Sequence, residues 1–403
     1  MSNLPRGIDL RGELMQRRLL VCVGSGGVGK TTVAAALAVE AARLGRRTLV
    51  ITIDPARRLA NSLGLEVLGN TETRIPDEKW ASVGIKPAGS LHAMMLDTRS
   101  TFDELIRRVS PNDATRARVL NNRAYQHINN TLVNTRDYMA AEKLYDVYTR
   151  GDYDLIVLDT PPMKNAIDFI ESGSLLTRFL DEKIMRWFLT PYDESRVFGR
   201  RMMLGTSAIA FRLLGSIFGR EFLDELSEFF LAFKDLYRGF RERSERVAAL
   251  MADVDETRFA IVCSPRPTSI EEARFFHEQL TSRDINASVF IVNQVGRYAN
   301  RYPHADRRFL GDTEREWLAD RLEGADPGHV DQLCDRLEAN FREAYQASLS
   351  DQDTVETLRS WVGRDQTFRT VPRFIDEVMD FEGLLEIAAR VFESDTQVSA
   401  ADG

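Results

Sequence analysis

A glycine-rich stretch near the start of the chain constrains the fold more than any other feature. Residues 24–32 read GSGGVGKTT and satisfy the pattern G-x-x-x-x-G-K-[ST], in which backbone amides surround phosphate groups. An apolar run, Leu19–Val23, precedes the stretch, and an alanine-rich segment with helical spacing, Thr31–Leu44, follows it. This order predicts a buried strand, a phosphate-binding loop and a helix N-terminus. The alternative is a chance glycine-rich turn, which eight residues in register and two matching flanks disfavour.

The chemistry of such a loop predicts a role for each of its members. The predicted nucleotide-binding residues are Gly24, Ser25, Gly26, Gly27, Val28, Gly29, Lys30, Thr31 and Thr32. Lys30 is expected to contact the β- and γ-phosphates of ATP, which makes it a candidate catalytic residue. The hydroxyl of Thr31 is expected to bind Mg²⁺.

Composition narrows the class of protein. The chain has 403 residues, enough for two or three domains or for one large α/β domain with insertions. Its net charge is −8 and it has no basic stripe, so we expect no nucleic-acid partner. The three cysteines and five histidines are scattered along the chain. This spacing predicts neither a disulfide framework nor a thiolate zinc site and suits a reducing cytosol.

Targeting and membrane segments are not predicted. Residues 1–18 are charged and contain no apolar core of the kind found in signal peptides. The segment most similar to a membrane span, Met202–Phe218, is short and is interrupted by Arg212. We therefore expect a cytoplasmic protein that is not integral to a membrane. Any association with a membrane is expected to be transient and to occur through a partner.

Apolar runs alternate with helical segments along much of the chain. Strands are predicted at Arg47–Ile53, Leu91–Leu96, Tyr153–Asp159, Arg258–Cys263, Ala287–Val292 and Phe368–Val371, and helices at Phe102–Tyr148, Ser269–Leu280 and Phe381–Phe392. This alternation predicts an α/β fold with a doubly wound, mostly parallel sheet.

Two acids follow predicted strands. Asp54 comes directly after Arg47–Ile53, and Asp159 is the last residue of Tyr153–Asp159. Ligands bind at the carboxyl ends of parallel strands, and Asp159 has the position of the acid that holds magnesium in phosphate-loop enzymes. The alternative for Asp159 is a solvated acid at the end of a buried strand, which the preceding phosphate-binding loop makes less favourable.

Residues 174–250 differ in character from the rest, because leucine, phenylalanine and methionine are dense there. The predicted amphipathic helices have more apolar surface than one buried face requires. The surplus indicates either a subdomain core or an exposed groove for an apolar segment of a client protein. Base rates favour a core, and both interpretations stay open.

These motifs together resemble the family of ATPases that drive arsenical pumps and target tail-anchored proteins. The similar segments occur in a consistent order, at residues 26–32 (GGVGKTT), 52–56 (TIDPA), 158–162 (LDTPP), 292–294 (VNQ), 371–372 (VP) and 377–378 (EV). The resemblance covers residues 19–378. It implies a dimeric P-loop ATPase with a helical subdomain insertion, which uses ATP and Mg²⁺.

The resemblance also implies roles for individual residues. Asp54 matches the acid that orients or deprotonates the attacking water, and Asp159 matches the acid that binds Mg²⁺ through water. Asn293 matches an asparagine that contacts adenine, and Pro372 belongs to a loop that covers the adenine.

The implied domain organisation follows from the same comparison. It consists of an N-terminal extension (1–18), a first part of the nucleotide-binding domain (19–173), a helical client or partner subdomain (174–250), a second part of the nucleotide-binding domain (251–392) with a helical insertion at about 297–361, and a disordered tail (393–403).

Three departures from the family pattern affect the expected activity. Ser25 stands where the family has a lysine that reaches the phosphates of the partner subunit, and residues 163–165 read MKN instead of Thr-Gly-His. The C-x-x-C zinc pair is also missing. The chain is most similar to a bacterial branch in which two unlike subunits pair. We therefore expect a dimer with a related ATPase subunit, a heterodimer rather than a homodimer, and slow hydrolysis by the chain alone.

Three functions remain after this comparison. The first is an ATP-hydrolysing switch that binds or targets a client protein, and the second is a weakly hydrolysing regulatory subunit of a heterodimeric ATPase. The third, an arsenite pump driver, is disfavoured because soft oxyanions need converging thiolates.

Overall fold

The computed structural model describes residues 9–54, 57–97, 113, 117, 135–161, 167, 242–298, 310–322, 326–363, 366–374 and 380–393. Several predicted features lie outside these residues. They are most of the helical segment Phe102–Tyr148, nearly all of the subdomain 174–250 including Met202–Phe218, residues 163–165, and the tail after residue 393.

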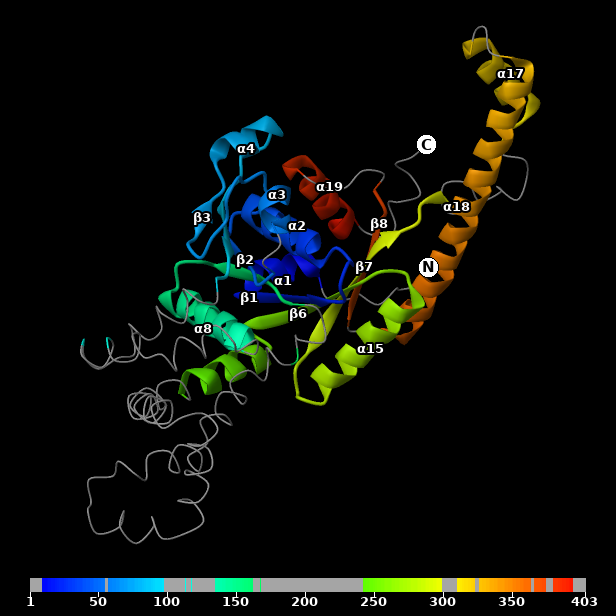
Figure 1. Ribbon diagram of the computed structural model, residues 1–403. Coiled ribbons are helices and arrows are strands. Elements are labelled where there is room, and N and C mark those ends of the chain that lie inside the picture. Colours follow the sequence, from blue (N-terminus) through cyan, green and yellow to red (C-terminus); the bar gives the residue numbers. More distant parts are fainter. Residues whose placement is uncertain are drawn as a thin grey trace, which may run out of the picture.

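Within the described residues, eight strands form a single sheet with the order β3-β4-β2-β5-β1-β6-β7-β8 (Figure 1). The strands are β1 (Leu19–Gly24), β2 (Arg47–Thr52), β3 (Thr73–Arg74), β4 (Ser90–Met95), β5 (Leu155–Asp159), β6 (Thr257–Cys263), β7 (Ala287–Val295) and β8 (Thr367–Pro372). Each neighbouring pair is parallel except β3 with β4. The predicted doubly wound, mostly parallel sheet is confirmed.

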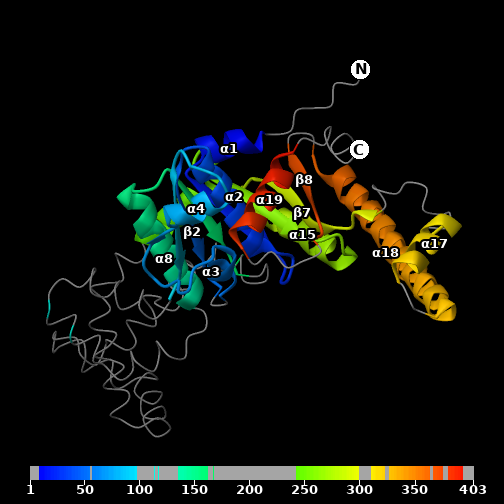
Figure 2. The same ribbon diagram turned by 90° about the horizontal axis from the view of Figure 1, so that it is seen from above.

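Helices cover both faces of this sheet. The described helices with full bounds are α1 (Leu10–Gln16), α2 (Lys30–Arg43), α3 (Arg58–Ser62), α4 (Asp77–Ser82), α8 (Thr135–Arg150), α15 (Pro267–Thr281), α17 (Asp312–Arg321), α18 (Pro327–Trp361) and α19 (Phe381–Phe392). Figures 1 and 2 show α2 and α19 over one face, and α8 and α15 over the other. The alternation of strand side chains explains this arrangement. In β1, Leu20 and Cys22 join the core on the α2 side, whereas Leu19, Val21 and Val23 join the core on the α8 side.

The alanine-rich helix α2 lies between the sheet and α19. Its small side chains allow it to approach β1, β2 and β5, so that nearly all of its residues are buried. The amphipathic helix α19 covers it through Leu384, Ile387 and Val391. This packing fixes the first turn of α2 against the carboxyl ends of the central strands.

Part of the predicted N-terminal extension, residues 1–18, is helical. From Leu10 the chain forms α1, whose Leu10 and Leu14 are buried in the core beside α2. Glu13 is also buried and accepts hydrogen bonds from Arg17, at 2.8 Å, and from Arg258 of β6. A seven-residue helix with so few apolar side chains leaves little periodic signal, which explains why the sequence did not predict it.

The insertion between β7 and β8 is a helical arm. The C-terminal half of α18 packs against the body through Leu358, and Gly296 closely approaches Ser348. The N-terminal half projects outward, with α17 beside its far end (Figures 1 and 2). Among the helices of the described ranges, none combines the length and the apolar character needed to cross a bilayer.

Candidate functional site

The glycine-rich loop connects β1 to α2 at the carboxyl edge of the sheet. Strand β1 lies between β5 and β6. Strands β2 to β5 lie on one side of β1 and strands β6 to β8 on the other. Ligands in such folds usually bind at the point where the strand order changes direction in this way. Gly27 and Gly29 have φ angles of 79° and 81°, a left-handed conformation that favours glycine. Gly29 is also the N-cap residue of α2, so the loop leads directly into the positive end of a helix.

Two side chains at the end of β7 form hydrogen bonds with this loop. The side-chain amide of Asn293 donates to the carbonyl of Val28 at 2.9 Å, and that of Gln294 donates to the carbonyl of Gly27 at 3.5 Å. Asn293 is buried, and Gln294 has a left-handed φ of 65°. The structure therefore places the predicted adenine-contacting asparagine against the phosphate-binding loop, where its amide positions the loop backbone. The assigned contact between Asn293 and adenine stays a prediction.

A buried polar cluster lies beside the loop. Asp159, at the end of β5, is fully buried, and its Oδ2 accepts hydrogen bonds from the hydroxyls of Thr31 at 2.7 Å and Thr52 at 2.8 Å. The Nζ of Lys30 lies 3.9 Å from the Oδ1 of Asp159. The structure thus brings together Lys30, Thr31 and Asp159, three of the predicted site residues.

The amine of Lys30 also contacts the segment that follows β5. It donates to the carbonyl of Pro161 at 3.0 Å and to that of Thr160. Contact with a triphosphate requires this amine to exchange the two carbonyls for phosphate oxygens. Lys30 is therefore able to link occupancy of the loop to the position of Thr160 and Pro161.

Burial shifts the pKa values of the two charged groups in opposite directions. Desolvation raises the pKa of Asp159, against the lowering effects of Lys30, Thr31 and Thr52. Desolvation also lowers the pKa of Lys30, against the raising effect of Asp159 and, more weakly, of Asp54. Each charge loses water and is partly compensated by the other, so removing one partner leaves a buried, uncompensated charge.

Asp54 lies at the same edge, just beyond β2. Its backbone N–H donates to the hydroxyl of Thr52 at 3.2 Å, and its Oδ2 lies 3.9 Å from an Nη of Arg58. About a third of the side chain is exposed, at 35%. Its charge acts on both Lys30 and Asp159. Asp54 is thus the solvent-facing acid of the site, whereas Asp159 is the enclosed one.

Pro372 lies farther away along the sheet. It is the last residue of β8, which is separated from β1 by β6 and β7. The following residue, Arg373, donates its backbone N–H to Val295 at 2.8 Å. The predicted adenine-covering position is therefore at the correct edge, and its role stays a prediction.

The donor set fits magnesium beside a triphosphate. The Oδ1 of Asp159 is buried and makes no hydrogen bond to the described residues, and the hydroxyl of Thr31 lies next to the same carboxylate. Carboxylate and hydroxyl oxygens are hard donors of the kind that Mg²⁺ prefers, and magnesium usually takes only one or two of them from the protein. Among the described residues, no group of three or more histidines, cysteines or acids is placed to hold a metal ion.

Two residues of the site escaped the sequence analysis. Thr52 connects the two acids, because its hydroxyl donates to Asp159 and accepts from the backbone of Asp54. The feature that identifies Thr52 as part of the site is the parallel register of β2 with β5, which places Thr52 opposite Asp159. The other residue is Glu272 of α15, which accepts a hydrogen bond from the hydroxyl of Ser25.

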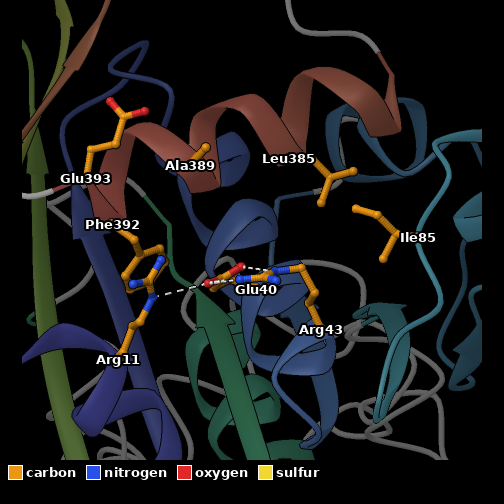
Figure 3. Close-up of a pocket in the computed structure, with 8 residues that line it drawn as sticks. All are labelled: Arg11, Glu40, Arg43, Ile85, Leu385, Ala389, Phe392 and Glu393. Atoms are coloured by element: carbon orange, nitrogen blue, oxygen red, sulfur yellow. Dashed lines mark hydrogen bonds and ion pairs between the residues drawn. The ribbon is translucent and has the colours of Figure 1, made fainter. Parts of the chain in front are cut away.

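A separate pocket of about 590 Å³ lies at the other end of α2 (Figure 3). It is lined by Arg11, Glu40, Arg43, Ile85, Leu385, Ala389, Phe392 and Glu393. Buried Glu40 accepts hydrogen bonds from Arg43 at 2.7 and 2.9 Å and lies 3.4 Å from Arg11. Its lining charges balance, and Glu40 is roughly 15 Å along the helix from Lys30. This pocket is therefore distinct from the phosphate-binding loop.

Comparison with known proteins gives a consistent result. The model of the anion-transporting ATPase family matches residues 17–301. The chain is 26% identical over 274 residues to "ATPase get3" of Aspergillus terreus, covering 68% of this chain and 71% of that protein. It is 24% identical over 277 residues to "ATPase ASNA1 homolog 1" of Paramecium tetraurelia, covering 68% and 73%. It is 27% identical over 311 residues to "ATPase GET3C" of Arabidopsis thaliana, covering 73% and 72%.

Proposed function

Because the chain belongs to the anion-transporting ATPase family, we propose that it is a magnesium-dependent ATP switch that acts as a dimer and binds or targets a partner or client protein. Its reaction is the hydrolysis of ATP to ADP and phosphate. The observation that carries the proposal is the buried cluster of Lys30, Thr31 and Asp159 beside the glycine-rich loop.

Each residue of the cluster has a distinct task in this proposal. The amides of residues 24–32 and the positive end of α2 bind the phosphates, and Lys30 neutralises charge on the β- and γ-phosphates. Thr31 and Asp159 hold Mg²⁺, which supplies charge neutralisation and orientation of the phosphates when bound. Asn293 and Pro372 are assigned to the adenine by the family pattern.

Asp54 is proposed to orient the attacking water. Its partial exposure supports this role, because a water-positioning acid must reach solvent as well as the γ-phosphate. The backbone hydrogen bond to Thr52 ties its position to Asp159. The hydroxyl of Thr52 therefore contacts both acids.

Ser25 supports a heterodimer. A serine hydroxyl cannot replace a lysine that stabilises transition-state charge across a dimer, and here the hydroxyl donates to Glu272 of the same chain. The proposed partner is a related ATPase subunit that supplies the lysine. The same residue favours the second candidate function, a weakly hydrolysing regulatory subunit.

The client and the location follow from the family resemblance. We assign the client or partner to residues 174–250 and place the protein in the cytoplasm, with transient membrane association through a partner. Arsenite transport is a weaker candidate, because Cys22, Cys263 and Cys334 are each buried on different elements. Burial raises the pKa of Cys263 to about 12, which disfavours the thiolate that binds such an anion.

The decisive experiment compares ATP hydrolysis by the wild type and by the Asp54→Asn variant, with and without the partner subunit. We expect the substitution to lower hydrolysis about 100-fold and to leave ATP binding within about threefold, since asparagine preserves the shape. Asp97→Asn is the matched control, because Asp97 follows β4 as Asp54 follows β2. Equal rates for Asp54→Asn and the wild type would exclude the proposed water-positioning role. Hydrolysis at background level under every condition would favour the regulatory subunit.

A further inference from the structure

Residues 310–363, here called the acidic arm, contain α17 and α18. The match to the family model ends at residue 301, so the acidic arm lies outside the matched residues. Its N-terminal half projects from the body in both views (Figures 1 and 2). The residues assigned to the ATP site, from Gly24 to Asn293 and Pro372, all lie outside the acidic arm.

Charge distinguishes the acidic arm from the rest of the molecule. It contains 13 acidic and five basic residues, a net charge of −8. The whole chain also has a net charge of −8, so the remaining residues are balanced. A negative field concentrated on one part of the molecule attracts cationic partners and repels anionic ones.

Exposed apolar side chains accompany this charge. Trp317 is 56% exposed, Leu322 38%, and Leu333 and Leu337 39% each. They are four of the nine large apolar residues exposed among the described residues. Leu333 and Leu337 are one turn apart on α18 and lie on the same side of that helix. Exposed aromatic and aliphatic groups within a charged surface are typical of contact sites for other proteins.

The acidic arm presents these groups on a rigid support. Leu310 of the preceding segment, with Val330 and Cys334 of α18, forms a small core that Leu318 of α17 packs against. Arg315 of α17 donates to Asp335 at 2.9 Å and to Glu338 at 3.1 Å on α18. A preordered surface loses little conformational freedom on binding.

From the charge and the apolar groups together we infer that the acidic arm docks a basic amphipathic helix of another protein. The leucines and Trp317 would contact the apolar face of that helix, and the surrounding acids its lysines or arginines. The sign of the charge disfavours nucleic acids and anionic membranes. It also disfavours the acidic arm of a second copy, because like charges would face each other. This inference is independent of the proposed ATP site.

A designed peptide tests the inference on the full chain. The probe is an 18-residue helical peptide of lysine and leucine, with leucine on one face, and its binding is followed by fluorescence anisotropy. Two control peptides replace lysine by glutamate or leucine by serine. We expect binding of the lysine–leucine peptide, with an affinity that falls as salt rises, and binding about tenfold or more weaker for both controls.

Variants locate the binding surface. Replacing Leu333 and Leu337 by serine, or Glu316 and Asp320 by their amides, is expected to weaken binding about tenfold. Phe275→Ser on α15 is the matched control, because Phe275 is 58% exposed outside the acidic arm. Circular dichroism verifies folding of each variant. Equal affinity of the acidic-arm variants and Phe275→Ser would overturn the inference. It would also be overturned if duplex DNA or phosphatidylserine vesicles bound more tightly than the peptide through the same residues.

Discussion

Gly29 is the point at which the phosphate-binding loop and the end of β7 approach most closely. Its φ of 81° is left-handed, and a Cβ atom placed on it would lie 2.3 Å from the Nδ2 of Asn293. That nitrogen donates to the carbonyl of Val28. A side chain at position 29 therefore strains the backbone and disturbs the hydrogen bond that holds the loop.

We expect Gly29→Ala to lower the free energy of unfolding by about 2 kcal/mol, measured by chemical denaturation in the absence of nucleotide. Gly26→Ala is the matched control in the same loop. A Cβ atom there meets nothing within 4 Å, and its φ is not left-handed, so the change should stay within about 0.5 kcal/mol. Equal effects of the two substitutions would contradict the close approach described here.

The candidate site was predictable only where its signal is local in the sequence. The loop of residues 24–32 is continuous, and Asp159 ends an apolar run, so both could be identified directly. Thr52 and Glu272 depend on contacts between distant segments. Thr52 becomes informative only through the register of β2 with β5, and Glu272 through the hydrogen bond that it accepts from Ser25.

At the scale of elements, α1 is fixed to the sheet by a buried ion pair. Burial raises the pKa of Glu13, but the hydrogen bonds and charges of Arg17 and Arg258 outweigh burial, so the net shift is a lowering from 4.5. A carboxyl with a lowered pKa in the folded state stabilises the protein above its unfolded pKa. That contribution is lost as the pH falls through the folded value.

Glu13→Gln should therefore destabilise the protein by about 2 kcal/mol at pH 7, measured by urea denaturation. The difference from the wild type should shrink below pH 4.5, where the carboxyl of the unfolded wild type becomes protonated, and should be lost below the lowered pKa of the folded state. Asp255→Asn is the control, because Asp255 also contacts Arg17 but is 91% exposed. A loss that stays constant from pH 7 to pH 3 would show that the charge of Glu13 does not stabilise α1.

The long helix α18 allows a comparison along one element. Leu358 is fully buried against the sheet, whereas Leu337 lies on the projecting half. We expect Leu358→Ala to cost about 3 kcal/mol of unfolding free energy and Leu337→Ala to cost less than about 0.5 kcal/mol. Thermal and urea denaturation measure both. Similar losses would indicate that the projecting half is packed as firmly as the anchored half.

The elements that could be predicted from sequence are those with a strong periodic pattern. Helix α19 begins and ends at the predicted residues Phe381 and Phe392, because its apolar face is continuous. Strand β3 has only two residues and forms by antiparallel pairing with β4. No local sequence pattern predicts such a short strand. Helix α1 was missed because it is short and has few apolar side chains, and the contact of its buried Glu13 with Arg258 of a distant strand leaves no local pattern.

At the scale of the whole molecule, the proposed heterodimer predicts that Ser25 limits ATP hydrolysis by one chain alone. If a cation from a partner completes the site, a lysine at position 25 should supply it in a dimer of identical chains. We expect Ser25→Lys to raise ATP hydrolysis by the isolated chain about tenfold or more, with a rate per chain that increases with protein concentration.

Ser25→Ala is the control for loss of the hydroxyl that donates to Glu272, and it should hydrolyse ATP at the wild-type rate. Rapid turnover by the isolated wild type would show that no second cation is required. An unchanged rate for Ser25→Lys at every concentration would show that a missing cation is not what limits the chain.

The central claim is that residues 24–32 bind a triphosphate while Thr31 and Asp159 hold magnesium beside it. Isothermal titration calorimetry with ATP, with and without Mg²⁺, tests it most directly. We predict that Mg²⁺ strengthens ATP binding to the wild type, that Lys30→Ala weakens binding about tenfold or more, and that Asp159→Asn removes the effect of Mg²⁺. Binding of ATP that is equally tight in Lys30→Ala, or equally dependent on Mg²⁺ in Asp159→Asn, would contradict the account.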